Sequence, residues 1–407
     1  MRDEWQARML GEVAQVSAGN SAPQNKALFA NGTHPFFRTA DAGRLRFGDI
    51  YEANDYLNDD GAKGLRRYPK GTILFPKSGA STFLNHRVML GVEGYVSSHL
   101  AAIVADRAQT EPRYLLYFLS TISAQDLVQD HAYPSLNLPA ISGITIQVPP
   151  LPEQQRIVAL LDEAFAGLAT VKANAEQNLQ NARAIFESHL QSVFSQRGEG
   201  WERVSLETLL DRRWIEGHLD GNHGSDYPRK EEFVQEGVPY ISANCLDEQS
   251  NIDMSRAKYL SPARASLLRK GIARNNDVLF AHNATVGPVS ILHTSEEKVI
   301  LSTSLTYYRC NPNHILAEYL AHYMRSHEFK KQYLQVMRQS TRNQVPITKQ
   351  REFFHIIPPL EDQERIVGTL DGLLENSQRL TRLYERKLAA LEELKKSLLH
   401  QAFNGDL

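Results

Sequence analysis

The sequence predicts an α+β protein built from two similar mixed α/β domains, each followed by a long helix, with the two helices paired as a coiled coil. Three observations lead to this fold class. The motif PPLPEQQRIVALLD, from Pro149, returns as PPLEDQERIVGTLD from Pro358. A long apolar periodicity follows each copy, and the segments before the two copies share fainter similarities in the same order. Internal repetition of this kind indicates duplicated structural units.

Each copy of the motif predicts the start of a long helix. Two prolines end an incoming strand, and acidic residues then occupy the first turn, where they complement the helix dipole. The equivalence continues without a gap to Phe194 in the first copy and Phe403 in the second. We therefore expect long helices within residues 149–197 and 358–407.

The periodicity of these helices is typical of a coiled coil. Alternating steps of three and four residues select mostly apolar positions, as in a heptad repeat. In the first copy they are Leu161, Ala164, Leu168, Val171, Ala175, Asn178, Ala182, Ile185 and His189; in the second they are Leu370, Leu373, Ser377, Leu380, Tyr384, Lys387, Leu391, Leu394 and Leu398. Asn178 and Lys387 fall at equivalent steps, where a polar residue can fix register. The alternative is two unrelated amphipathic helices. Paired helices of some forty residues, at about 1.5 Å per residue, would form a spacer of about 60 Å.

The segments before the helices predict two related domains, residues 1–148 and 198–357, with the boundary near Gly198-Glu199-Gly200. GTILFPKSGA from Gly71 is similar to NDVLFAHNAT from Asn276, and YVSSHLAAIVA from Tyr95 to ILSTSLTYYRC from Ile300. Their β-branched and aromatic content indicates strands, whereas RYLLYFLST and EYLAHYMRS indicate a helix in each domain.

Composition indicates a globular, cytoplasmic protein. The 407 residues are 42% hydrophobic and 23% charged, and the sequence contains neither a signal peptide nor an apolar run of membrane-spanning length. The two cysteines, Cys245 and Cys310, are interpreted as ordinary core or surface thiols. A net charge of −2 argues against a large nonspecific polyanion binder.

Motifs of catalysis are missing from the sequence. It has no dinucleotide-binding glycine motif, no phosphate-binding loop and no His-Glu-x-x-His helix, so we expect no cofactor, no metal and no catalytic residue. Asn311-Pro312-Asn313 lacks the second proline and the aromatic residue of an adenine methyltransferase motif. Asp277 with Glu296-x-Lys298 has a loosely nuclease-like spacing that arises often by chance. His322 and His327 are interpreted as surface residues.

The repeated motif and the order domain, helix, domain, helix resemble the specificity (S) subunits of type I restriction-modification systems over nearly the whole chain. The resemblance implies a noncatalytic subunit whose two target-recognition domains each read one half of a split sequence in double-stranded DNA. It also implies that the two helices form an antiparallel coiled-coil spacer with pseudo-twofold symmetry. Two methyltransferase (M) subunits and restriction (R) subunits are the implied partners. Divergence between FPKSGA and FAHNAT, at equivalent places, predicts that the half-sites differ. The rival hypothesis is a coiled-coil scaffold that does not read DNA; a self-sufficient methyltransferase or nuclease would need a cofactor site.

Candidate DNA contacts follow from residue type, since Arg and Lys suit phosphate and guanine, and Asn and Gln suit adenine. In the first domain they are Arg38, Arg66, Arg67, Lys70, Lys77, Ser78 and Arg87; in the second they are Arg212, Arg213, His282, Asn283, Arg338, Arg342, Asn343 and Gln344. The helix motif contributes Gln154, Arg156, Gln363 and Arg365, which either contact a partner or only tie the helices to their domains.

Overall fold

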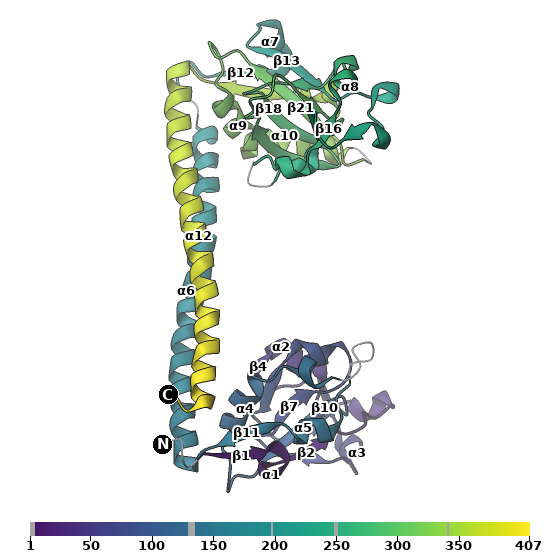
Figure 1. The fold of residues 1–407 in the computed structure, drawn as a ribbon, viewed down its shortest axis with the longest axis vertical. Helices are drawn as coiled ribbons and strands as arrows, with labels where there is room; N and C mark the ends of the chain where they lie inside the picture. Colours follow the sequence, from purple (N-terminus) through teal and green to yellow (C-terminus); the bar gives the residue numbers. More distant parts are fainter. Residues whose placement is uncertain (1–4, 129–134, 197, 248–250, 340–341) are drawn as a thin grey trace. The chain divides into compact units, whose positions relative to one another are not determined.

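The computed structural model describes residues 5–128, 135–196, 198–247, 251–339 and 342–407, which form two compact units (Figure 1). Unit 1 spans Met1–Glu176 and Arg386–Leu407, and unit 2 spans Gln177–Glu385. The unit boundaries cut through both long helices. Each unit therefore contains one mixed α/β domain and a part of each helix.

Unit 1 contains a short strand pair and two sheets. The ends of its domain are joined by antiparallel pairing of β1 (Gln6–Met9) with β11 (Thr145–Val148). The first sheet has the order β2-β10-β7-β8-β4, with bounds Ala14–Ala18, Leu100–Ala105, Ile73–Pro76, Arg87–Leu90 and Phe47–Ile50. The second sheet has the order β5-β3-β9-β6, with bounds Asp55–Leu57, His34–Phe37, Gly94–Val96 and Arg67–Tyr68. Its α-helices are α1 (Leu10–Val13), α2 (Thr39–Leu45), α3 (Asp59–Ala62), α4 (Pro112–Ser120) and α5 (Leu138–Ser142).

Unit 2 has the same plan. β12 (Glu202–Ser205) pairs with β22 (Phe354–Ile357) as β1 pairs with β11. The first sheet has the order β13-β21-β18-β19, with bounds Ile215–Asp220, Leu305–Cys310, Val278–Asn283 and Thr285–Ile291. The second sheet has the order β14-β16-β15-β20-β17, with bounds Phe233–Val234, Lys258–Leu260, Val238–Ile241, Val299–Leu301 and Ile272–Ala273. Its α-helices are α7 (Leu206–Asp211), α8 (Pro262–Leu267), α9 (Ala317–Arg325), α10 (His327–Arg338) and α11 (Ile347–Gln350).

The faint sequence similarities fall on equivalent elements of the two domains. GTILFPKSGA contains β7 and NDVLFAHNAT contains β18, each flanked by the same neighbours in its sheet. The helical strings form α4 and α9. Both second sheets also contain a parallel pair, β3 with β9 and β15 with β20. The predicted duplication of a mixed α/β domain is confirmed.

The long helices α6 (Leu151–Ser195) and α12 (Leu360–Asn404) have 45 residues each and begin directly after their Pro-Pro pairs. Lys172 of α6 pairs with Glu392 of α12 within unit 1, and Arg183 pairs with Glu385 within unit 2. Since higher numbers in α6 meet lower numbers in α12, the helices run antiparallel. The predicted antiparallel coiled coil is thus confirmed.

We call the row of helix positions that face the other helix or the domain the seam. The seam departs from the predicted register in the later half of each helix. Asn178 and Lys387 are exposed, and Leu179 and Leu388 take the inward positions. Phe186 is likewise buried where Ile185 was expected, and Leu394 is exposed. A straight helix has 3.6 residues per turn, so its inward face drifts from a strict 3.5-residue pattern. Asn178 and Lys387 therefore do not set the register from the seam.

A serine is buried between the two helices in unit 2. Ser377 is 7% exposed, and its hydroxyl donates a hydrogen bond of 2.6 Å to the Ala182 carbonyl oxygen of α6. A hydroxyl that bonds the facing backbone needs a close approach of the two helices, which the small Ala182 side chain allows. This bond, and not the two polar residues predicted from the pattern, links α6 to α12 at this level.

The largest core cluster of each unit lies between its first sheet, its domain helices and the long helices. In unit 1, α4 contributes Tyr114 and Phe118, whose rings lie 5.2 and 5.4 Å from that of Phe403 in α12. In unit 2, Tyr319 and Tyr323 of α9 contact Phe194 of α6 in the same way. A buried aromatic side chain contributes about 2 to 3 kcal/mol, so these contacts hold each helix end firmly on its domain.

Candidate nucleic-acid interface

A two-stranded ribbon at the end of β18 carries most of the predicted polar contacts of unit 2. We call it the 283/344 ribbon; it comprises residues 282–284 and 342–345. Asn283 pairs with Gln344 in an antiparallel bridge, and the Val345 N–H donates to the His282 carbonyl oxygen at 2.8 Å. Asn343 joins it twice, because its carbonyl oxygen accepts from the Ala284 N–H and its side-chain amide donates to the Ala284 carbonyl. The ribbon therefore carries three amide side chains, those of Asn283, Asn343 and Gln344.

Unit 1 has the equivalent ribbon at the end of β7, comprising residues 77–79 and 135–136, which we call the 78/135 ribbon. Ser78 pairs with Ser135, and the Leu136 N–H donates to the Lys77 carbonyl oxygen at 2.8 Å. Residues 129–134 and 340–341 of the segments that lead into the ribbons lie outside the described residues. The two ribbons share a backbone pattern and differ in chemistry, with hydroxyls in one and amides in the other.

A left-handed residue follows the bridge in each ribbon. Gly79 has φ of 75° and Ala284 has φ of 65°. Glycine adopts this conformation freely, whereas alanine is strained there by about 1 to 2 kcal/mol. Such strain persists only where the surrounding bonds hold it, and it is often found at binding sites. The bonds from Asn343 to Ala284 supply that restraint.

A buried polar network supports the 283/344 ribbon from beneath. The Gln350 side chain is fully buried and makes four hydrogen bonds: its oxygen accepts from His218 and from the Tyr308 hydroxyl, and its nitrogen donates to the Thr306 hydroxyl and the Val345 carbonyl. His282 is 1% exposed, and its Nδ1 lies 3.0 Å from the same Val345 carbonyl oxygen. Burial lowers the pKa of the His218 side chain to about 4 and also lowers that of His282.

His282 and Arg87 are wrong as predicted DNA contacts, because both side chains lie inside their domains. Arg87 is fully buried, its guanidinium donates to the His86 and Ile122 carbonyls, and it lies 3.4 Å from the Phe75 ring centroid. Burial lowers the pKa of Arg87 to about 9. These two residues have structural roles, and neither can reach a phosphate without unfolding the strand that carries it.

The other basic candidates of unit 1 lie on its surface. Arg66 and Arg67 are exposed and flank Tyr68; Arg66 donates to Gln15, and Arg67 pairs with Glu93 at 2.7 Å. Lys70 is also exposed. Arg38 is half-buried at the start of α2, where it pairs with Asp55 and lies over the rings of Phe29 and Phe36. An exposed ion pair holds its partners weakly, so phosphate can compete for Arg67.

The basic candidates of unit 2 are exposed as well. Arg212 pairs with Glu202 at 2.7 Å and stacks near Trp214, and Arg213 follows it in a left-handed conformation. Arg338 ends α10, and Arg342 lies at the 283/344 ribbon. The structure thus brings Arg342 to the amides and leaves Arg212 and Arg213 on the separate turn between α7 and β13.

The helix motif divides into a buried half and an exposed half. Gln154 and Gln363 are fully buried and bonded identically: the oxygen of Gln154 accepts from the Glu111 N–H, and its nitrogen donates to the Gln109 and Pro149 carbonyls. Gln363 repeats this with Leu316, His314 and Pro358. These amides tie each helix start to its domain and cannot face a partner. Arg156 and Arg365 are exposed and pair within their helices with Glu153 and Asp362.

A second tie, between the motif aspartates and the domain helices, was not predicted. Asp162 accepts from Tyr117 and pairs with Arg113 at 2.9 Å, and Asp371 pairs with His322 at 2.8 Å. The hydrogen bond from His322 lowers the pKa of Asp371. His322 is 2% exposed, so its prediction as a surface residue is wrong. The repetition of both aspartates in the motif was the signal that could have found this contact.

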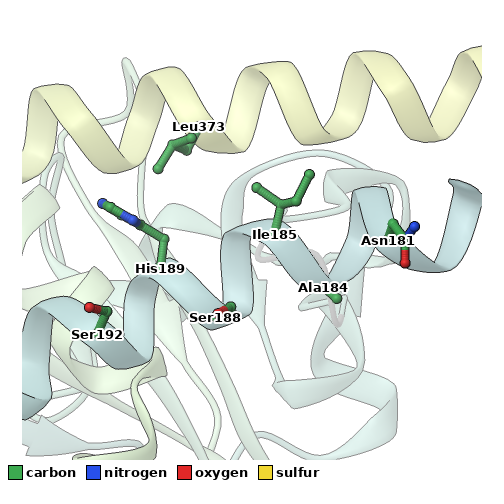
Figure 2. Close-up of a pocket in the computed structure, with 7 residues that line it drawn as sticks. All are labelled: Asn181, Ala184, Ile185, Ser188, His189, Ser192 and Leu373. Carbon is green, nitrogen blue, oxygen red and sulfur yellow. The ribbon is translucent and has the colours of Figure 1, made fainter.

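The helix pair of unit 2 has a hollow of about 580 Å³ on its surface (Figure 2). Its lining is Asn181, Ala184, Ile185, Ser188, His189, Ser192 and Leu373. Ile185 is 46% exposed, although the periodicity placed it on the seam. The register drift therefore leaves an apolar side chain beside small polar ones on the open face of α6.

Neither the nuclease-like spacing nor a metal site is supported by the described residues. Asp277 is buried and forms a two-bond ion pair with Arg309, so it is not available as a metal ligand. Within the described ranges, no group of His, Cys, Asp or Glu could hold a metal ion, and no helix is long and apolar enough to span a membrane.

Two domains of one topology, each tied to paired long helices and each ending in a polar ribbon, define a class of two-domain recognition proteins. The family model for the type I restriction modification DNA specificity domain matches residues 2–181 and 221–392. This chain belongs to that family, and its role is DNA recognition within a type I restriction-modification complex.

Individual relatives agree with the family, one of them over the full chain and another over part of it. The type I restriction enzyme EcoBI specificity subunit of Escherichia coli is 20% identical over 436 residues, which cover 100% of this chain and 87% of that protein. The MjaIX specificity subunit of Methanocaldococcus jannaschii is 26% identical over 166 residues, which cover 40% of this chain and only 38% of that protein.

Solved structures share the fold. A chain from a study of complex assembly and conformational transition of the type I R-M system has a TM-score of 0.77 at 20% identity, covering 99% of this chain and 98% of that one. The HsdS subunit from Thermoanaerobacter tengcongensis has a TM-score of 0.61 at 20% identity, covering 99% of this chain and 97% of that one.

Proposed function

We propose that this chain is the noncatalytic subunit that selects a split, asymmetric DNA sequence, with one domain reading each half-site. The observation that carries the proposal is the pair of equivalent ribbons with unlike side chains. The major groove of B-DNA admits a two-stranded ribbon. The two ribbons share one backbone plan but carry different side chains: Ser78 and Ser135 in one copy, and Asn283, Asn343 and Gln344 in the other. This combination suits two domains that read different sequences.

The paired helices would act as the spacer between two such readers. Base edges recur in the same orientation about every 34 Å along B-DNA, so two groove-reading surfaces need a defined spacing. Helices α6 and α12 continue through both units and are bonded to each domain at the buried glutamines. A spacer of this kind would set the length of the gap between half-sites.

Exposed arginines and lysines would position the domains through phosphate. Arg66, Arg67 and Lys70 in unit 1, with Arg212, Arg213, Arg338 and Arg342 in unit 2, are the residues we assign to this role. The net charge of −2 predicts weak binding by the chain alone. Partner subunits would supply the remaining basic surface.

The partners we propose are two methyltransferase subunits and the restriction subunits. A repeated motif presents two equivalent surfaces, on which two copies of one partner can dock alike. Arg156 and Arg365 are the exposed repeated residues of that motif. The hollow beside Ile185 lies on the same helix as Arg156 and is a second candidate surface.

The test is a methylation map of DNA from cells that contain this chain with its methyltransferase, against cells that contain the methyltransferase alone. We expect methylation at a split sequence only with this chain. Exchange of residues 1–148 for those of a relative should then change one half of that sequence. If the complex forms and no methylated sequence depends on the chain, it is a scaffold that does not read DNA.

A further inference from the structure

We infer that Asn343 reads an adenine in the half-site of the second domain, from a position fixed by the ribbon and by the Gln350 network. The inference rests on the proposed function and names the base that one residue selects. Asn343 is exposed, lies between Arg342 and Gln344, and is bonded through both its backbone and its side chain to Ala284.

Besides its bond to Ala284, the Asn343 side chain has one donor and one acceptor with which it can pair with adenine. An asparagine side chain has two N–H donors and one carbonyl acceptor. One N–H donates to the Ala284 carbonyl, which holds the side-chain plane. The other N–H and the Oδ1 atom are the pair that donates to adenine N7 and accepts from adenine N6 in the major groove. An amide already held in place loses less rotamer entropy on binding than a mobile one.

The ribbon itself is held from both sides. Above, the strained Ala284 is restrained by Asn343; beneath, the Val345 carbonyl accepts from the Gln350 amide at 3.1 Å and from His282 at 3.0 Å. Gln350 is in turn fixed by three further bonds to the first sheet. Gln350 is thus a positioning residue, whose side chain sets where Asn343 lies without itself reaching DNA.

The first domain lacks this chemistry at its described ribbon positions. Ser78 and Ser135 occupy the places of Asn283 and Gln344, and a hydroxyl can bond to any base without choosing adenine. The position equivalent to Gln350 is Ile141, which is buried and apolar. We therefore assign this adenine contact to the half-site of the second domain.

The experiment uses the full chain in its complex with the methyltransferase and maps methylated sequences for Asn343→Ala, Asn343→Asp and the control Asn313→Ala, an exposed asparagine elsewhere in unit 2. We expect Asn343→Ala to relax one A·T position in one half-site, lowering discrimination there about tenfold or more. Asn343→Asp should shift that position toward C·G, since a carboxylate accepts from cytosine N4. Asn313→Ala should leave the map unchanged.

Gln350→Leu tests the positioning role with a separate readout. We expect the same A·T position to relax while the other half-site stays selective. Gln350→Glu should relax it too, because a carboxylate cannot donate to the Val345 carbonyl oxygen. The inference is overturned if Asn343→Ala leaves every position selective or relaxes only a G·C position. A chain whose unaltered form directs no split sequence would instead refute the proposed function, so the two failures are distinct.

Discussion

The Gln154 side chain ties α6 to the domain before it, and the Gln363 side chain ties α12 to the domain before it. Replacing either glutamine should lower the free energy of unfolding. Each amide makes three hydrogen bonds to backbone groups in a fully buried place. Gln154→Ala leaves a buried N–H and two carbonyls without that partner, and we expect a loss of about 2 to 4 kcal/mol. Denaturant unfolding measures it, with the exposed neighbour variant Gln155→Ala as control. Equal stability of the two variants would contradict this account.

Arg87 should affect folding and not DNA binding. Its guanidinium fills the space beside Phe75 and satisfies two carbonyls, so we expect Arg87→Ala to lower the free energy of unfolding by about 2 to 4 kcal/mol. The salt dependence of DNA binding should not change, because no phosphate contact is lost.

Arg67→Ala is the matched surface variant. Arg67 is exposed and only weakly held by Glu93, so stability should stay within about 0.5 kcal/mol. The slope of the logarithm of the DNA-binding constant against the logarithm of salt concentration should become shallower, by about the amount that one phosphate contact contributes. If Arg87→Ala changed that slope and Arg67→Ala did not, the assignment of the two residues would be reversed.

Residue type indicated which side chains could contact DNA, but not which of them face solvent. Arg87 and Arg67 look alike in a local window, and the difference arises from β8, whose buried residues pack under α4 and carry Arg87 inward. His282 and His322 were misplaced for the same reason, since the partners that accept them, Val345 and Asp371, are distant in sequence. Burial depends on these long-range contacts, which no single-sequence pattern contains.

At the scale of elements, the register of the coiled coil can be tested by paired variants. Leu179 and Leu388 are partly buried, while their neighbours Asn178 and Lys387 are exposed. We expect Leu179→Ala and Leu388→Ala to cost about 1 to 2 kcal/mol each, less than a fully buried leucine. Asn178→Ala and Lys387→Ala should be neutral or slightly stabilising, because alanine favours a helix. Thermal unfolding of the four variants decides the register, and the opposite order would restore the predicted one.

The order of elements was predictable to the extent that the chain repeats itself. Both Pro-Pro helix starts, both domain helices and the strands β7 and β18 were found because two copies support each other. The 283/344 ribbon was found only as residues: Asn283 and Gln344 were both named, but their pairing is a backbone contact across sixty residues of chain. The sheet order likewise depends on pairings, such as parallel β15 with β20, that leave no local pattern.

For the whole molecule, the two domains combine one topology with unlike cores. Among its described residues, unit 2 buries four histidines: His218 and His282 in its first sheet, His322 in α9 and His355 in β22. In unit 2, His218 pairs with Tyr308 across two strands. The equivalent pair in unit 1 is Val16 with Ile103, and both of these residues are apolar. Ile146 likewise occupies the place of His355. The two copies thus share a fold but differ in the polarity of their interiors, and we expect the buried histidines to make the stability of unit 2 sensitive to pH.

We expect unit 2 to lose stability before unit 1 as the pH falls below 6.5. Burial lowers the pKa of His218 to about 4 and that of His355 to about 3, so the folded domain favours neutral rings. Above pH 6.5 the rings are neutral in both states and their stability is fully present. Below that value the unfolded chain binds protons first, and each ring costs about 1.4 kcal/mol per pH unit until its folded pKa is reached. The charge of nearby Asp220 raises the pKa of His218 and so reduces this loss of stability, while the charges of Arg351 and His282 lower that pKa and increase the loss.

Hydrogen exchange of the full chain at pH 7.5 and pH 5 measures this difference, because peptides from β13, β18 and β22 can be compared with those from β2, β7 and β11. Exchange rates must first be corrected for their intrinsic pH dependence. We expect protection to fall in the unit 2 strands and to change little in unit 1. His355→Ile, which installs the residue of the other copy, should weaken the effect, since one of the shifted rings is then gone. Equal loss of protection in the two units at pH 5 would show that the buried histidines do not govern acid stability.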